Sequence, residues 1–183
     1  MEQVPKIEVS EDLNIAIDRA MLKSALTLVD KWDFSQTRIK LGGASYCGWD
    51  LKRITEAELD YKRFLALAKA APDLPIVPSR DLDRFWHEHI LDTRRYAKDC
   101  YELFGDFFHH NPFFGMNGSE DEAEWIAAAE QSSTIWQIAF DNDLYRIQDI
   151  ETTSHVVRHC RAHCIPSSEV VARRPHCRSH CIP

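Results

Sequence analysis

One segment of the chain, residues 80–104, runs without proline or glycine, as a long helix requires. Ser79 stands directly before it, where a hydroxyl can cap the first turn. Gly105 follows it, where a helix commonly stops. The segment therefore predicts one continuous helix from residue 80 to residue 104.

Three further segments have apolar residues at helical spacing. Residues 11–32, capped by Ser10, predict an amphipathic helix. Thr55 with Glu58, and Ser119 with Glu122, have the spacing of a capping box, which predicts helices from these points to about Ala70 and through Phe140. Residues 41–49 read as a glycine-containing loop, and Pro72, Pro75 and Pro78 as an open connection.

No pair of segments has the alternation of β-strands. We therefore expect an all-α fold, a bundle of about four main helices over residues 1–147. Residues 148–183 have no sustained apolar face, and we expect an extended, partly disordered tail.

The tail contains two octapeptides that differ at one position. HCRAHCIP occupies residues 159–166 and HCRSHCIP residues 176–183. Each copy offers two thiols and two imidazoles beside a central arginine, which favours the thiolate form. The candidate residues of the tail are its cysteines, histidines and central arginines: Cys160, Cys164, Cys177, Cys181, His159, His163, His176, His180, Arg161 and Arg178. Of the other two cysteines, we expect Cys100 to be packed in a helix and Cys47 to be more exposed.

Charge divides the chain in the same place. Residues 151–183 carry five arginines against two acids, a net +3, so residues 1–150 carry −10 of the total −7. An acidic body disfavours nucleic acid as a partner. The first residues lack the apolar core of a signal peptide, and no run is long enough to span a membrane, so we expect a cytoplasmic protein that does not bind membranes.

The repeats admit three interpretations. Thiolate and imidazole suit Cu(I) and Zn(II), so the tail could be a chelator. Near-identity of two short segments is also what local recognition by a modifying enzyme would demand, as in the precursor of a ribosomally made, modified peptide. The third interpretation is a recent duplication of a disordered tail, or two disulfides in an exported protein.

The predicted third helix and the segment after it are rich in histidine. We consider His87, His89, Asp92, His109 and His110 as candidate ligands of a transition metal, zinc or iron. Their spacing matches no established metal motif. The structural alternative is that these side chains cap helices and form hydrogen bonds in an aromatic core.

The same region resembles a known family. It reads D-x-FWH-x-HILDT-x-x-Y-x-x-DC, then FG and HH-x-P-x-FG, over Asp83–Gly115. This is similar to the signature of the glycine-rich domain-containing protein-like family. The resemblance is dense over residues 77–115 and extends less specifically from Gly48 to Tyr145. It implies a helical domain with site-like His, Asp and Cys positions, but no particular reaction. The long Gly-rich segment of that family is missing here, and the repeats are not part of its pattern.

We therefore predict a precursor-type protein, a helical domain that presents its Cys-rich tail to a modifying enzyme as its protein partner, and no enzyme activity of its own. The alternatives are a Cu(I)- or Zn(II)-binding protein and a metal-dependent domain that modifies its own tail. The cofactor in either alternative is a transition metal: zinc, iron or copper.

Overall fold

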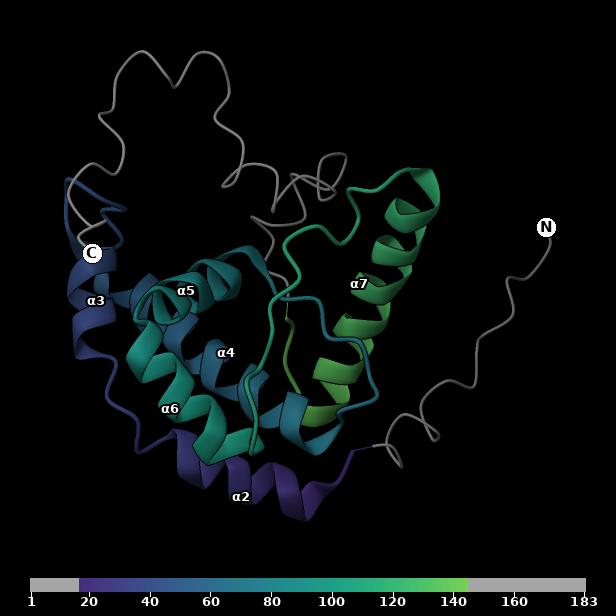
Figure 1. Cartoon of the computed structure of the whole chain (residues 1–183), viewed down its shortest axis with the longest axis horizontal. Helices are drawn as coiled ribbons and strands as arrows, with labels where there is room; N and C mark the ends of the chain where they lie inside the picture. Colours follow the sequence, from purple (N-terminus) through teal and green to yellow (C-terminus); the bar gives the residue numbers. More distant parts are fainter. Residues whose placement is uncertain (1–16, 145–183) are drawn as a thin grey trace, which may run out of the picture.

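The computed structural model describes residues 17–144, which form six helices and no strand. The prediction of an all-α fold is confirmed. The helices are α2 Arg19–Val29, α3 Ser35–Gly42, α4 Leu51–Ala70, α5 Arg80–Leu91, α6 Thr93–Phe104 and α7 Ser119–Phe140. Figure 1 shows α2 below α4 and α6, and α7 to one side of the group.

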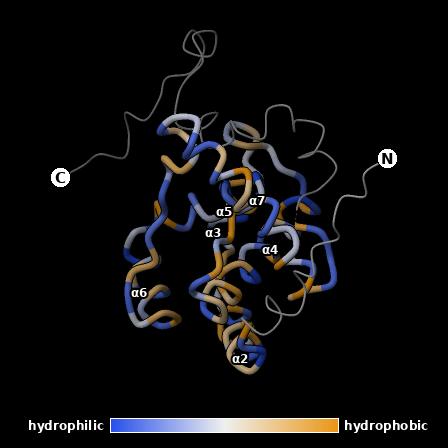
Figure 2. The backbone as a smooth tube through the Cα atoms, turned by 90° about the vertical axis from the view of Figure 1, so that its right-hand side faces the viewer, coloured by the Kyte–Doolittle hydropathy of each residue, from blue (hydrophilic) through white to orange (hydrophobic). Residues whose placement is uncertain are grey.

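Helix α4 forms the centre of the core. It packs against α2, α3 and α5, and its buried residues include Tyr61, Phe64 and Leu65. Hydrophobic and hydrophilic residues alternate along the helices, as Figure 2 shows, so each helix buries one face. Within residues 17–144 no helix is long and apolar enough to cross a membrane.

Two helix starts differ from the prediction because aspartates cap them. The Asp18 carboxylate accepts a hydrogen bond from the Met21 amide at 2.9 Å, so α2 begins at Arg19, and the continuous helix predicted over 11–32 is wrong. The Asp50 carboxylate likewise accepts from the Arg53 amide at 2.8 Å. Helix α4 therefore begins at Leu51, and the capping box predicted at Thr55 is wrong.

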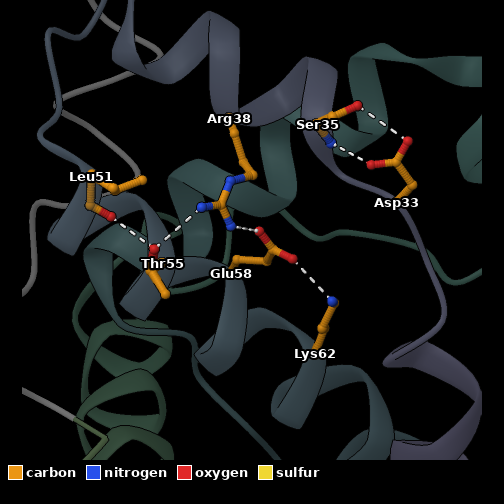
Figure 3. Close-up of polar contacts among 7 residues, drawn as sticks. All are labelled: Asp33, Ser35, Arg38, Leu51, Thr55, Glu58 and Lys62. Carbon is orange, nitrogen blue, oxygen red and sulfur yellow. Dashed lines mark hydrogen bonds and ion pairs between the residues drawn. The ribbon is translucent and has the colours of Figure 1, made fainter.

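The Thr55 and Glu58 side chains instead connect α4 to α3, a short helix that the sequence analysis missed. Figure 3 shows Arg38 of α3 reaching both, at 2.7 Å from Glu58 Oε2 and 3.3 Å from Thr55 Oγ1. Lys62 pairs with the other Glu58 oxygen at 2.9 Å. Half-buried charges thus hold α3, whose eight residues include a single buried one, Leu41.

The helix predicted over residues 80–104 is broken at Asp92. Its ψ of 70° takes the chain out of the helical range, so α5 ends at Leu91 and α6 begins at Thr93. Gly105, with φ of 80°, ends α6 as predicted. The prediction of one continuous helix from residue 80 to residue 104 is therefore wrong. The turn at Asp92 lets α6 fold back on α5, which buries Tyr96 against Trp86.

Helix α7 begins at Ser119, but Gly118 is its N-cap residue and no side chain caps it, so the predicted Ser119–Glu122 capping box is wrong. Its contact with the proline-containing connection depends on one buried hydroxyl. Ser132 Oγ accepts a hydrogen bond from the Val77 amide at 2.7 Å and lies 2.6 Å from the Ala128 carbonyl oxygen. This connects α7 to residues 71–79, which form one wall of the pocket described below.

Candidate metal site

Three potential metal ligands meet on one side of α5. Asp83 and His87 lie one helical turn apart, so their side chains project from the same face. His110 reaches them from the segment between α6 and α7, which passes beside α5 (Figure 1). The site therefore combines one helix with one loop.

Aromatic packing holds that loop in place. The Trp86 ring stacks on Phe108, with centroids 5.3 Å apart, and meets the His110 ring edge-on at 4.5 Å. The Tyr96 hydroxyl donates a hydrogen bond to the Phe108 carbonyl at 2.5 Å. Phe108 is thus held from two sides, which positions His110 two residues later.

The ligand atoms converge on a common point. His110 Nε2 lies 3.1 Å from Asp83 Oδ1 and 3.3 Å from His87 Nε2, and His87 Nε2 lies 3.7 Å from Asp83 Oδ1. Asp83 is buried, and the two imidazoles are half-buried. All three side chains are therefore partly shielded from water. A charge interacts with them more strongly there than it would in bulk water, because the dielectric constant is lower.

These separations fit a tetrahedral ion. Zinc bonds to nitrogen and carboxylate oxygen are about 2.0–2.2 Å long, so adjacent ligands of a tetrahedral zinc lie about 3.4 Å apart. The three distances bracket that value. Two imidazoles with one carboxylate are also the ligands of non-haem Fe(II) sites, in which other positions stay open.

An apolar pocket of about 440 Å³ adjoins the three ligands. Asp83 and His110 form part of its lining. Six aromatic side chains form one part of the remaining wall, and proline and aliphatic residues of the connection before α5 form another; the aromatic residues are Phe64, Trp86, Phe104, Phe108, Phe114 and Trp125. An ion held by the three ligands would therefore have an apolar space beside it, large enough for a small ligand.

The model of the UCP032817-like family matches residues 24–142, about two thirds of the chain. The chain belongs to the UCP032817-like family. Comparisons with curated proteins and with solved structures gave no match. All three ligands and the whole pocket lie in the UCP032817-like domain, whereas both octapeptides lie outside it.

Of the five predicted ligands, this domain brings His87 and His110 together and places His89 elsewhere. His89 is 1% exposed and lies in the core. Its Nδ1 lies 2.8 Å from the Tyr61 hydroxyl and its Nε2 lies 3.2 Å from Asp99 Oδ2. Burial, with a smaller effect of the Arg95 guanidinium, lowers the pKa of His89 to about 4, so the ring is neutral at pH 7.

The Tyr61 hydroxyl fixes the tautomer of this neutral ring. Burial raises the pKa of Tyr61 well above its usual value, so the hydroxyl stays protonated and donates a hydrogen bond to His89 Nδ1. The remaining proton is then on Nε2, which faces Asp99. His89 is therefore a hydrogen-bonding residue of the core, as the structural alternative for these histidines has it.

The other two predicted ligands, Asp92 and His109, are exposed. Asp92 lies at the junction of α5 and α6, where its backbone ends one helix and precedes the next. The His109 ring packs against Phe107, with centroids 4.9 Å apart. Neither belongs to the group of three ligands found within residues 17–144.

Asp83 was not predicted as a ligand, although Asp83 and His87 have the i, i+4 spacing that places two side chains on one helix face. Glu88, a buried acid one residue after His87 in α5, was not predicted either. Glu88 pairs with Lys40, lies 3.1 Å from Arg84 Nη2 and accepts a 2.5 Å hydrogen bond from the Tyr46 hydroxyl. The positive charges of Lys40 and Arg84 compensate the negative charge of Glu88, so Glu88 has a structural role in an ion-pair network.

The two cysteines of the UCP032817-like domain are unpaired. Cys100 is buried, as predicted, and burial raises the pKa of its thiol. Cys47 is half-buried in the loop after α3. The candidate cysteines, histidines and arginines of the repeats lie outside the described residues.

Proposed function

We propose that the helical domain binds a transition-metal ion, Zn(II) in the first place, through Asp83 Oδ1, His87 Nε2 and His110 Nε2. The convergence of these three atoms, with separations of 3.1–3.7 Å, carries the proposal. Three protein ligands with a fourth position left open are typical of zinc sites that bind a further ligand or water.

Hydrogen bonds account for the cluster less well than a cation does. Asp83 Oδ1 can only accept, so a proton on His110 Nε2 that points toward the carboxylate can be shared with His87 Nε2 only as a bent, three-centre hydrogen bond. A proton on His87 Nε2 that points toward His110 requires a bare His110 nitrogen, whose lone pair then faces the carboxylate. A central cation attracts all three atoms at once.

Zinc titration of the full chain tests this proposal, provided that the tail thiols are removed. In the variant C160S/C164S/C177S/C181S we expect one zinc ion per chain by calorimetry. His110→Gln should weaken this binding at least tenfold because it removes a ligand. His109→Gln is the matched control, since His109 is the exposed neighbour whose ring packs on Phe107. Equal zinc binding by the two variants would overturn the proposal.

The second candidate function concerns the tail. We propose that the octapeptides are a substrate segment, which a partner enzyme modifies while the helical domain presents it, as in a peptide precursor. This candidate is favoured by the end of the family match at residue 142, before both octapeptides begin. The two near-identical octapeptides would give a separate enzyme two neighbouring copies of one recognition sequence, outside the family domain. The cytoplasmic location and the absence of nucleic-acid binding stay predictions.

Mass spectrometry after thiol alkylation tests the second candidate. Protein from its native host should carry mass changes confined to residues 159–166 and 176–183, and protein made alone in another host should not. The same changes in both samples would indicate modification by the domain itself. Four alkylatable tail cysteines in both samples would contradict the precursor function and leave metal binding.

A further inference from the structure

A single ligand could fill both the open position of the metal site and the apolar pocket. Asp83 and His110 line both, so a ligand that coordinates the ion can extend directly into the pocket. Such a ligand needs a donor atom next to an apolar group. The aromatic wall, which includes Phe108, Phe114 and Trp125, favours flat or proline-like groups.

The chain itself contains this combination twice. Each octapeptide ends in Cys-Ile-Pro, at residues 164–166 and 181–183, so a thiol is followed at once by two apolar residues. We propose that a Cys-Ile-Pro segment of the repeats docks on the helical domain, with its thiolate as the fourth ligand of the metal and Ile-Pro in the pocket. This inference rests on the proposed metal site.

The chain is long enough for this. Leu144 is the last described residue, and Cys164 follows it by twenty residues. At about 3.3 Å per residue these can span about 65 Å. A compact domain of the size described here has a radius of gyration of about 14 Å, hence a diameter of about 36 Å. A cysteine of either copy can therefore reach the site from any point on the surface.

Charge and linkage also favour the repeats as the occupant. Residues 151–183 carry +3 and residues 1–150 carry −10, so the two parts attract each other. A tethered segment has an effective concentration of about 1 mM. Thiolate is also a strong ligand for zinc, and its coordination releases the thiol proton to solvent.

The test uses Co(II), which takes the place of Zn(II) and reports its ligands by colour. The full-length variant C160S/C164S/C177S/C181S is loaded with Co(II), and the amidated peptide HCRSHCIP is added. We expect a sulfur-to-cobalt charge-transfer band that elutes with the protein in gel filtration. A peptide in which Gly-Gly replaces Ile-Pro should bind at least tenfold more weakly. Phe114→Ala in the protein should weaken binding of the parent peptide to a similar degree and leave Co(II) binding unchanged.

The outcomes separate the two proposals. If His110→Gln and the parent protein bind Co(II) alike before any peptide is added, the metal site itself is wrong. If the parent binds Co(II) but no charge-transfer band elutes with it, the docking proposal is wrong and the metal site stands. Equal affinity for the Ile-Pro and Gly-Gly peptides would overturn the role of the pocket.

Discussion

The indole Nε1 of Trp86 donates a hydrogen bond of 2.9 Å to the hydroxyl of Tyr96. The same hydroxyl donates to the Phe108 carbonyl, so one buried oxygen joins α5, α6 and the loop that carries His110. Hydrogen bonding inside the core thus sets the position of a residue at the candidate metal site.

Tyr96→Phe is expected to lower the free energy of unfolding by about 1–3 kcal/mol, because the Trp86 N–H and the Phe108 carbonyl both lose their partner. The loosened loop should also weaken zinc binding by His110. Urea denaturation and zinc titration measure the two effects. Tyr101→Phe is the control, since Tyr101 is exposed on the same helix. Unchanged zinc affinity in Tyr96→Phe would show that this bond does not position the loop.

His89 should make the fold sensitive to acid. Its pKa of about 4 in the folded chain lies below its usual value of 6.5, so between these pH values the unfolded chain takes up a proton that the folded chain does not. The His89 contribution to stability is therefore present above pH 6.5 and is lost as the pH falls toward 4, by at most about 3 kcal/mol. The raised pKa of Asp99 acts in the opposite sense and offsets part of this loss.

Chemical denaturation at several pH values without zinc measures the effect of His89. His89→Gln should show a smaller loss of unfolding free energy between pH 6.5 and 4 than the parent, whereas His109→Gln should follow the parent. Parallel curves for parent and His89→Gln would contradict the assignment of a neutral, buried His89.

Two glycines provide a matched pair. Gly105 and Gly115 have φ of 80° and 82°, so alanine is strained by about 1 kcal/mol at either position. An alanine Cβ at position 105 would contact nothing, but at position 115 it would lie 2.9 Å from Trp125 Cγ. Gly115→Ala should therefore destabilise the fold more than Gly105→Ala in urea denaturation. Equal losses would mean that Trp125 gives way without cost.

Removal of the Glu88 side chain should lower the free energy of unfolding more than removal of the charge of its partner Lys40. The carboxylate is buried, while the side chain of Lys40 is 46% exposed and can return to water. Glu88→Ala removes a charged hydrogen-bond acceptor and should cost about 1.5–3 kcal/mol in unfolding free energy. Lys40→Met should cost less than about 1 kcal/mol. A larger loss for Lys40→Met in thermal denaturation would contradict this order.

Much of the fold could be predicted because helical periodicity and stop signals act locally. Gly105 ended α6 as expected, and the all-α class followed from the spacing of apolar residues. The break at Asp92 could not be predicted, since the residues around it favour a helix and the turn is stabilised by a distant contact, Trp86 with Tyr96. Helix α3 was missed because charged contacts with α4, such as Arg38 with Glu58, hold it.

The candidate site was predicted only in part. Two residues along a helix turn the side chain by about 200°, so His87 and His89 cannot face the same ion. The same rule places Asp83 on the same face as His87, so this pair could be predicted from the sequence. The approach of His110 could not be foreseen, because it depends on the stacking of Phe108 against Trp86.

The fold-back of α6 on α5 also bears on how the chain folds. Asp83, His87 and His110 lie within twenty-eight residues of sequence, and the bonds that position them join partners ten and twelve residues apart. Closing so short a loop costs little chain entropy, and contacts between neighbours in sequence form quickly. Residues 80–110 therefore contain the bonds that position the three candidate ligands, and these bonds can form before α2 or α7 docks.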